Sequence, residues 1–328
     1  MPKVLITTVP FGDKNRLPLE LLEGAGIEYL INPLGRKLTE PELAEMVLDF
    51  DVLIAGTEMI TDLVMAKAPR LKLISRVGIG LDSVDLLAAR RRGIQVSYTP
   101  DAPAPAVAEL TIGLMFSLLR SIHLANAGLH SGQWHRYFGR RITEVTIGIV
   151  GAGRIGGRVL RRLSRLGSPR LLVNDLKPNL DIVKNAVKVD WVDKQTIFRE
   201  ADLISLHLPL TGLTKNMIRY EHLKQMKPDA MIINTSRGGI INELDLAQVL
   251  NEGHLSGAAI DVFSQEPYAG PLGDIQRCLL TAHMGSMSAD CRAQMEIEAT
   301  EEAIRFLSGQ PLESAVPDDD YEVQKQGL

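Results

Sequence analysis

Short β-rich runs alternate with helical patterns along this chain, and they do so in two separate series. Strands that alternate with helices pair in parallel and are connected by right-handed crossovers. The expected strands of the first series are Val4–Thr7, Ile27–Leu30, Val52–Ile54, Leu71–Ser75 and Ile94–Ser97. The helical stretches between them are Pro18–Glu23, Pro41–Leu48, Thr61–Ala68 and Ser83–Arg92.

A proline-rich break separates the two series. Residues 99–105 hold three prolines, which cannot continue a strand or the interior of a helix. A long apolar helix is expected next, at Ala106–Leu119, as a connection between two domains. The expected strands of the second series are Thr146–Val150, Leu171–Asn174, Ala186–Val189, Leu203–His207, Ala230–Asn234, Ala258–Val262 and Leu279–Ala282.

The pattern therefore predicts an α/β protein with two doubly wound parallel sheets. Six or seven strands in the second series suit a nucleotide-binding sheet. The amphipathic helix expected at Ala289–Leu307 would return to the first domain, so the second domain is inserted into the first. The expected boundaries are 1–101 with 287–328 for one domain, and 102–286 for the other. The acidic, polar tail at Asp318–Leu328 is predicted to be disordered.

Composition excludes several classes of protein. With a net charge of −4 and 5% aromatic residues, the chain has neither the basic surplus nor the stacking side chains of a nucleic-acid binder. No run approaches the ~18 apolar residues of a membrane span. The two cysteines, Cys278 and Cys291, fit neither a metal site nor a disulfide framework. They favour a reducing compartment, and we expect a cytoplasmic protein without a structural metal.

One glycine pattern predicts a dinucleotide site. Gly151, Gly153 and Gly156 follow an expected strand and open an expected helix, whose first residues include Arg154 and Ile155. In such a loop the first glycine permits a tight turn, the second lets a pyrophosphate approach the backbone, and the third lets helix and strand pack closely. The pyrophosphate would lie at the helix N-terminus, where unpaired N–H groups favour an anion.

The end of the next strand predicts which dinucleotide binds. Asp175 follows Leu171–Asn174, at the distance where a carboxylate accepts hydrogen bonds from the ribose hydroxyls. The same carboxylate would repel the 2′-phosphate of NADP, so NAD is the expected cofactor. The nearby Lys177 leaves the strictness of that preference open.

Several motifs in order make the chain resemble the D-isomer-specific 2-hydroxyacid dehydrogenases, including the phosphoglycerate dehydrogenase and glyoxylate reductase branches. Besides the glycine loop, the motifs are Arg76–Asp85, Val107–Glu109, His207–Thr211, Ile233–Gly239, Asp261–Phe263 with Glu266-Pro267, and Thr281–Ser286. The resemblance implies a Rossmann NAD domain inserted into a flavodoxin-like substrate domain. It also implies a homodimer that interconverts a small anionic D-2-hydroxy acid and its 2-keto acid.

The chemistry of that reaction selects three residues within these motifs. Arg237 is suited to hold the substrate carboxylate and polarise the carbonyl, because a guanidinium is planar and always charged. His283 is suited to donate a proton to the developing alkoxide. Glu266 would orient that imidazole and stabilise its charged form. A glutamine stands at this position in the related formate dehydrogenases, so a carboxylate argues against formate oxidation.

The resemblance implies further roles. Backbone amides around Val77 and Gly78 would bind the substrate carboxylate. Asp261 would accept from the nicotinamide carboxamide, Pro209 would flank the adenine, and Thr235 would line the nicotinamide side. Asp82 and Glu109 are expected to be structural, as a loop-fixing and a hinge residue.

Some alternatives stay open at the level of sequence. A non-catalytic, NAD-sensing corepressor-like scaffold and a phosphite-type dehydrogenase would carry the same residue types. The loop at Ala55-Gly56-Thr57 lacks the basic residue expected for 3-phosphoglycerate. Four further residues, Trp134, Arg136, Arg140 and Arg141, either form a solvated basic turn or reach the neighbouring subunit's active site to select a second anion.

Overall fold

The computed structural model describes residues 2–177 and 188–325. The chain forms two compact units, which we describe separately. Unit 1 comprises Met1–Pro103 and Met287–Leu328, and unit 2 comprises Ala104–Ser286. Each unit is built on one all-parallel sheet with helices around it, which confirms the predicted α/β class.

Unit 1 has a five-stranded sheet in the order β2-β1-β3-β4-β5, the order of flavodoxin-like folds. The central strands are short and almost wholly apolar, and they are buried because helices cover the sheet. The strands are β1 Lys3–Ile6, β2 Glu28–Ile31, β3 Val52–Ala55, β4 Leu73–Arg76 and β5 Gln95–Tyr98. The helices between them are α1 Leu17–Gly24, α2 Glu40–Met46, α3 Asp62–Ala66 and α4 Leu86–Arg91.

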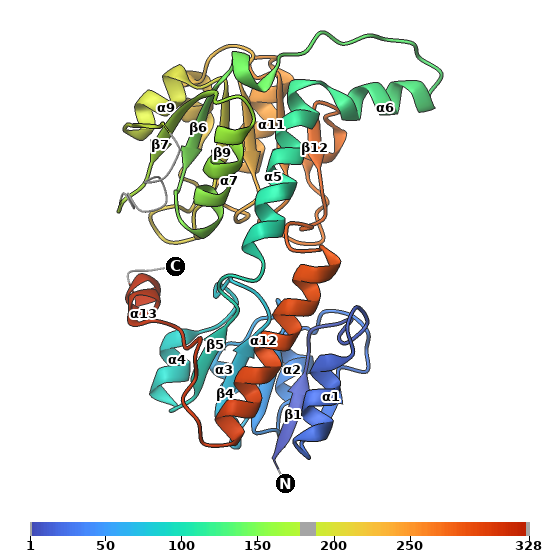
Figure 1. The fold of residues 1–328 in the computed structure, drawn as a ribbon, viewed down its shortest axis with the longest axis vertical. Helices are drawn as coiled ribbons and strands as arrows, with labels where there is room; N and C mark the ends of the chain where they lie inside the picture. The colour runs from blue at the N-terminus through green and yellow to red at the C-terminus, as the bar shows by residue number, and fades with distance from the viewer. Residues whose placement is uncertain (1, 178–187, 326–328) are drawn as a thin grey trace. The chain divides into compact units, whose positions relative to one another are not determined.

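Two C-terminal helices complete unit 1 (Figure 1). As predicted, α12 spans Ala289–Leu307 and packs on β4, where the Ser75 hydroxyl donates to the Ala299 carbonyl over 2.8 Å. The prediction of a disordered tail is wrong for the described residues, because α13 forms at Asp318–Lys325. The acidic residues at its start favour a helix N-terminus, and the buried Tyr321 anchors it.

Unit 2 has a seven-stranded sheet in the order β12-β11-β10-β9-β6-β7-β8. Its strand order reverses between β6 and β9, and ligands of doubly wound sheets bind at such a reversal, outside the carboxyl ends of the strands. The strands are β6 Thr146–Val150, β7 Arg170–Asn174, β8 Asp190–Trp191, β9 Leu203–Leu206, β10 Met231–Asn234, β11 Gly257–Ile260 and β12 Cys278–Leu280. The helices between them include α7 Arg154–Arg165, α9 Lys194–Glu200, α10 Tyr220–Gln225 and α11 Glu243–Asn251.

Two sequence predictions need correction in unit 2. The strand expected at 186–189 is absent from residues 188 and 189, while its first two residues lie outside the described part of the chain. The strand that follows, β8, covers Asp190–Trp191. The helix α5 begins at Ala104, inside the proline-rich break, and ends at Leu119. Proline is compatible with the first turn of a helix because the amide it lacks has no partner there, so Pro105 does not prevent this start.

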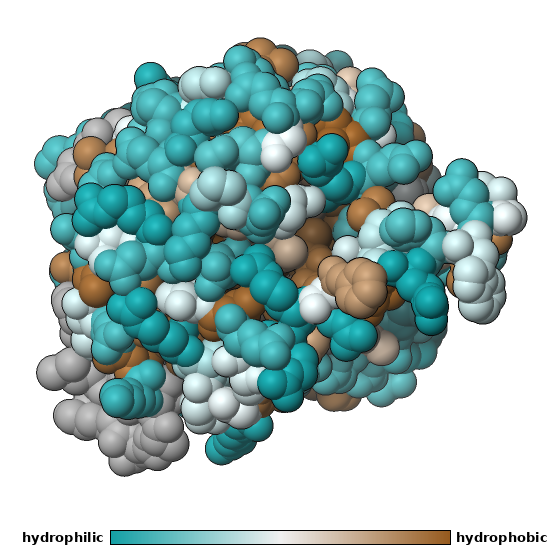
Figure 2. Space-filling model, turned by 90° about the horizontal axis from the view of Figure 1, so that it is seen from above, coloured by the Kyte–Doolittle hydropathy of each residue, from teal (hydrophilic) through white to brown (hydrophobic). Residues whose placement is uncertain are grey.

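A second helix, α6 at Ile122–His130, follows α5 and was not predicted. None of its nine residues, all of which the structure describes, is buried. In Figure 2, which looks onto this side of unit 2, hydrophilic residues cover most of the surface and apolar residues gather in hollows between them. Exposed large apolar residues of the segment 122–138 are Ile122, Leu129, Trp134, Tyr137 and Phe138.

Within the described residues, no single helix is long and apolar enough to cross a membrane. Only α5 and α6 taken together reach that length and composition, and they are bent by 66° at the break between them.

Candidate active site

The glycine loop, residues 151–156, joins β6 to α7 at the reversal of the strand order. A Cβ atom on Gly151 would lie 2.3 Å from the His207 carbonyl oxygen, and φ is +95° there. A Cβ on Gly156 would lie 2.0 Å from the Gly151 carbonyl oxygen. A Cβ on Gly153 would meet nothing within 4 Å. The outer glycines are therefore required by packing, whereas the middle one leaves open space at the start of α7, which fits a pyrophosphate.

Asp175 lies at the carboxyl end of β7, beside the glycine loop. Its Oδ2 accepts from the Ala152 amide over 2.6 Å, and its Oδ1 accepts from the Lys177 amide over 3.0 Å. These bonds fix the carboxylate next to the loop that would hold the pyrophosphate. They also leave lone pairs on both oxygens for ribose hydroxyls, because each carboxylate oxygen accepts more than one hydrogen bond.

Arg237, Glu266 and His283 follow three neighbouring strands of the same sheet. Arg237 comes after β10, Glu266 after β11 and His283 after β12, and these strands are hydrogen-bonded in the order β12-β11-β10. Parallel strands place their carboxyl ends at one edge, so the sheet brings the three segments to the edge that also carries the glycine loop. The edge thus has a dinucleotide side on β6 and β7, and an arginine–histidine side on β10, β11 and β12.

His283 and Glu266 are in direct contact. The Nδ1 atom of His283 lies 2.8 Å from Oε2 and 3.1 Å from Oε1 of Glu266, and both side chains are partly exposed. Oε1 of Glu266 also accepts from the Phe263 amide over 3.1 Å. With Nδ1 directed at the carboxylate, Nε2 is the ring nitrogen left to exchange a proton with a substrate.

Asp261 organises the loop that carries His283. It is fully buried and follows β11. Its Oδ1 accepts from the Thr281 hydroxyl and the Met284 amide over 2.6 and 2.7 Å, and its Oδ2 accepts from the Gly285 amide over 2.9 Å. Its carbonyl accepts from the His283 amide over 2.8 Å. Burial raises the pKa of Asp261, against the hydrogen bonds from Thr281, Met284 and Gly285 and the charge of His283.

These bonds hold His283 in an unusual conformation. Its φ is +50°, in the left-handed region that residues other than glycine rarely adopt. Such a conformation persists only where surrounding contacts fix it, and it is common at functional sites. The carboxamide role expected for Asp261 stays a prediction, since the carboxylate is already engaged at three points.

The loops after β10 and β11 touch through their backbones. A Cβ atom on Gly238 would lie 1.9 Å from both the carbonyl carbon and the carbonyl oxygen of Phe263. Only glycine permits this approach, which places the residue after Arg237 directly against the segment that leads to Glu266. The two loops are thereby held in a fixed relation, and this contact was not foreseen from the sequence.

The other predicted cofactor residues lie at the same edge. Thr235 is buried, and its hydroxyl shares a 2.8 Å hydrogen bond with Thr111 of α5. Pro209 is exposed after β9, and its carbonyl accepts from the Thr214 hydroxyl over 2.6 Å. His207 lies under the glycine loop, where Nε2 is 2.9 Å from the Ser205 hydroxyl. Burial lowers the pKa of His207 to about 3, so this ring is neutral at physiological pH.

The prediction for Val77 and Gly78 in unit 1 needs correction. The Val77 amide donates to the Ala55 carbonyl over 2.9 Å, and the Gly78 amide donates to the Thr99 hydroxyl over 2.8 Å. Both groups are therefore occupied within the chain. Among the described residues, the next two amides, of Ile79 and Gly80, donate to no group of the chain. The amides that stay without an acceptor in the chain are thus two positions further along the loop, a shift that only the hydrogen-bond pattern reveals.

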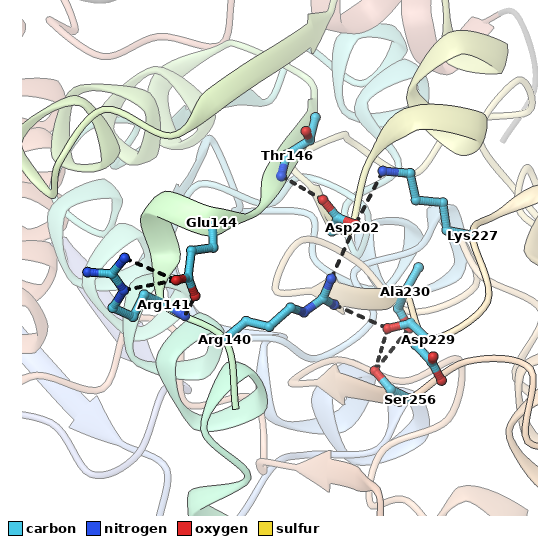
Figure 3. Close-up of polar contacts among 9 residues, drawn as sticks. All are labelled: Arg140, Arg141, Glu144, Thr146, Asp202, Lys227, Asp229, Ala230 and Ser256. Atoms are coloured by element: carbon cyan, nitrogen blue, oxygen red, sulfur yellow. Dashed lines mark hydrogen bonds and ion pairs between the residues drawn. The ribbon is translucent and has the colours of Figure 1, made fainter. Parts of the chain in front are cut away.

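Arg140 and Arg141 lie at the opposite, amino-terminal edge of the sheet of unit 2 (Figure 3). Nη1 of Arg140 lies 3.2 Å from Asp202, and Nη2 donates to the Asp229 carbonyl over 3.3 Å. Arg141 pairs with Glu144 over 3.0 Å. Both guanidinium groups thus have partners within their own chain. The side chains of Trp134 and Arg136 are exposed.

The comparisons with known proteins agree with this geometry. Residues 112–285 match the profile of the D-isomer specific 2-hydroxyacid dehydrogenase family's NAD binding domain. A hydroxypyruvate reductase of Thermotoga maritima is 36% identical over 281 residues, which are 82% of this chain and 89% of the relative. A D-3-phosphoglycerate dehydrogenase of Methanocaldococcus jannaschii is 36% identical over 96% of this chain, which spans only 59% of that relative. The crystal structure of the TT0316 protein from Thermus thermophilus superposes with a TM-score of 0.88 at 32% identity, covering 96% of this chain and all of that one.

The chain belongs to the family of D-isomer specific 2-hydroxyacid dehydrogenases, as the sequence motifs indicated. It is an NAD-dependent enzyme of that family, and unit 2 contains its NAD-binding domain.

Proposed function

We propose that this protein reduces a small anionic 2-keto acid to the D-2-hydroxy acid, with His283 as the proton donor. The observation that carries the proposal is the 2.8 Å contact between His283 and Glu266 on the sheet edge that also bears Arg237 and the glycine loop. When bound, the reduced nicotinamide supplies the hydride. The protein must then supply a cation for the substrate and a proton for its oxygen.

The three side chains divide this work. The Arg237 guanidinium binds the substrate carboxylate and stabilises the carbonyl oxygen as negative charge develops on it. Nε2 of His283 donates its proton to that oxygen. Glu266 holds the ring through Nδ1 and stabilises the charged imidazole. Asp261 fixes the loop so that the ring keeps its direction.

We assign unit 1 the role of substrate binding through the Ile79 and Gly80 amides. Two adjacent N–H groups without an acceptor in the chain suit a carboxylate. The glycine at position 80 has no side chain to obstruct an anion that approaches the backbone. The assignment replaces Val77 and Gly78 with the next two residues of the same loop.

A preference for NADH over NADPH follows from Asp175. Its carboxylate is fixed beside the glycine loop by the Ala152 amide. A 2′-phosphate placed there would face a like charge. We expect Asp175→Ser to lower the ratio of kcat/KM with NADH to kcat/KM with NADPH. Asp190→Ser on β8 is the matched control and should leave this ratio unchanged.

The preferred substrate is a monoanionic keto acid such as hydroxypyruvate, rather than a phosphorylated one. The loop after β3 carries no basic residue between Ala55 and Ile60. It carries instead the buried Glu58, whose carboxylate accepts from the Gly56 amide and the Thr7 hydroxyl. An anion at this position disfavours a phosphate group in the loop.

We infer that the active form is a homodimer in which a second copy covers the segment 122–138. Helix α6 has no buried residue, and Trp134 and Phe138 in the same segment are exposed. Monomeric proteins rarely leave so much apolar surface in water. Light scattering of the protein and of an Ile122→Glu, Leu129→Glu double variant tests this inference. Monomeric wild-type protein would contradict it.

The cytoplasmic location expected from Cys278 and Cys291 stays a prediction.

The decisive experiment for the reaction is a panel of 2-keto acids, with and without a second anionic group, assayed with NADH and with NADPH. We expect NADH oxidation with monoanionic keto acids and little with 3-phosphohydroxypyruvate. Binding of NADH without turnover on any keto acid would instead support the corepressor-like scaffold. In a parallel assay with phosphite and the oxidised cofactor NAD, formation of NADH together with no turnover of any keto acid would support the phosphite dehydrogenase.

A further inference from the structure

The C-terminal helix α13 is hydrogen-bonded to the end of the loop that carries Ile79 and Gly80. In Gln324, Oε1 accepts from the amides of Leu86 and Leu87 over 2.7 and 3.2 Å, and Nε2 donates to the Val84 carbonyl over 2.8 Å. One side chain, some 240 positions further along the sequence, thus satisfies two free amides at the start of α4 and the carbonyl that precedes them.

Other contacts dock α13 firmly enough to place Gln324. Tyr321 is buried in the core of unit 1, against which Ile79 and Leu81 also pack. The guanidinium of Arg90 on α4 lies 3.6 Å from the centre of the Tyr321 ring and contacts Asp318 over 2.5 Å. The Arg90 side chain is exposed, and a cation over an aromatic face contributes little at an exposed site, so the helix is held mainly by the buried tyrosine.

The loop itself is tied at both ends and is open in the middle. At its start, Val77 and Gly78 bond to Ala55 and Thr99. At its end, the Ser83 carbonyl accepts from the Ile60 amide over 2.7 Å, and Val84 bonds to Gln324. The two amides without an acceptor lie between these anchors. Their direction therefore depends on both anchors, and α13 supplies part of the second.

We propose that α13 is a clamp that positions the substrate-binding loop, and that Gln324 is its positioning residue. The proposal rests on the function assigned above to the Ile79 and Gly80 amides. Gln324 acts through the loop and touches neither substrate nor cofactor. Loss of the clamp should raise KM for the keto acid while leaving kcat and NADH binding close to wild type.

Two substitutions separate the two halves of the contact. Gln324→Ala removes all three hydrogen bonds. Gln324→Glu keeps the acceptor for Leu86 and Leu87 but loses the donor to Val84. We expect both variants to raise KM about threefold to tenfold. This is the change in affinity that corresponds to the loss of one or two neutral hydrogen bonds. Lys325→Ala, the next residue on α13, is the matched control and should leave KM unchanged.

Hydrogen exchange of the peptide that contains residues 77–86 provides a readout that does not need turnover. We expect faster exchange in both Gln324 variants than in the wild type and in Lys325→Ala. A changed melting temperature with unchanged exchange and unchanged KM would overturn the proposal, as would a wild-type KM in Gln324→Glu. If the wild type reduced no keto acid, the proposed function would fail, and unchanged exchange in the variants would independently overturn the clamp.

Discussion

The two edges of the sheet in unit 2 carry similar residue types in different arrangements. At the amino-terminal edge, Arg140 and Lys227 share the carboxylate of Asp202, each over 3.2 Å (Figure 3). At the carboxyl-terminal edge, Glu266 contacts His283, and Arg237 lies after the neighbouring strand. The first group ties a chain segment to the sheet. The second group lies at the carboxyl ends of the strands, at the same edge as the glycine loop.

The difference shows that residue type alone does not mark a functional site. Burial alone would raise the pKa of Asp202, but the Thr146 amide, Lys227 and Arg140 outweigh it and hold that pKa below its usual value. This carboxylate is stabilised as a permanent anion. His283 instead contacts a carboxylate through one ring nitrogen, and the other is the atom that we propose as the proton donor. Substitutions at the two edges should therefore separate activity from stability.

The largest effect is expected at His283. His283→Ala should lower kcat about 10²- to 10⁴-fold, because a positioned general acid contributes that much. NADH binding, followed by its fluorescence, should stay close to wild type. His222→Ala, on α10, is the control for a histidine outside this edge. Wild-type turnover of His283→Ala would remove the proposed proton donor.

Arg237→Lys should have the next largest effect. A lysine keeps the charge but cannot bind a carboxylate through two parallel N–H groups. We expect kcat/KM for the keto acid to fall roughly 10- to 100-fold, which corresponds to about 1.4–3 kcal/mol. Arg140→Lys at the other edge should change kcat/KM less than twofold. Equal losses in the two variants would contradict the contrast between the edges.

Asp261→Asn tests the support of the histidine loop. The carboxylate accepts three hydrogen bonds in a buried site, and an asparagine NH₂ group would face one of those donors. We expect a loss of about 1–3 kcal/mol in the free energy of unfolding, together with a lower kcat. Urea titration and steady-state kinetics measure the two effects. An unchanged kcat in a stable variant would show that Asp261 does not position His283.

His207 should make the protein sensitive to acid. Its pKa is lowered to about 3 in the folded state, so between pH 6.5 and 3 the unfolded chain binds a proton that the folded chain does not. Stability is therefore lost as pH falls below 6.5, by about 1–2 kcal/mol at pH 5. His207→Gln should flatten the dependence of the free energy of unfolding on pH in this range. An equally steep dependence in the variant would show that other groups cause it.

The smallest effect is expected at Asp202. Asp202→Asn keeps an acceptor for the Thr146 amide but loses the charge that faces Arg140 and Lys227. Partly exposed ion pairs contribute at most about 1 kcal/mol, so unfolding should shift by that amount or less. The pKa of Asp202 is lower in the folded protein than in the unfolded chain. The contribution is therefore fully present when the pH is above the pKa of the unfolded chain, and it is lost as the pH falls through the pKa of the folded protein. Kinetic constants of the variant should match the wild type.

The sequence predicted most strands of both units, and the helices of unit 1 apart from α13, because their apolar periodicity is strong. It also predicted which loops carry Arg237, Glu266 and His283, since each follows a recognisable strand. It could not predict which amides of the loop at 77–80 stay available, because this depends on Thr99 and Ala55, which are distant in sequence. The bonds of Asp261 to residues 281–285 were hidden for the same reason.

For the C-terminal tail, the sequence predicted disorder where the structure has a helix. Acidic and polar residues at 318–328 favour disorder when they are considered alone, yet one tyrosine and one glutamine find partners on α4. Such docking depends on a surface that local composition does not describe. The exposed helix α6 was missed because its pattern buries no face within the chain.

The backbone contact between Gly238 and Phe263 has a consequence for anyone who wishes to alter the specificity of this enzyme. No residue with a side chain fits at position 238 while Phe263 keeps its place, so mutations in either loop will be felt in the other. Directed libraries should randomise residues 236–239 together with 261–266, since separate screening of each segment would discard combinations that succeed only jointly.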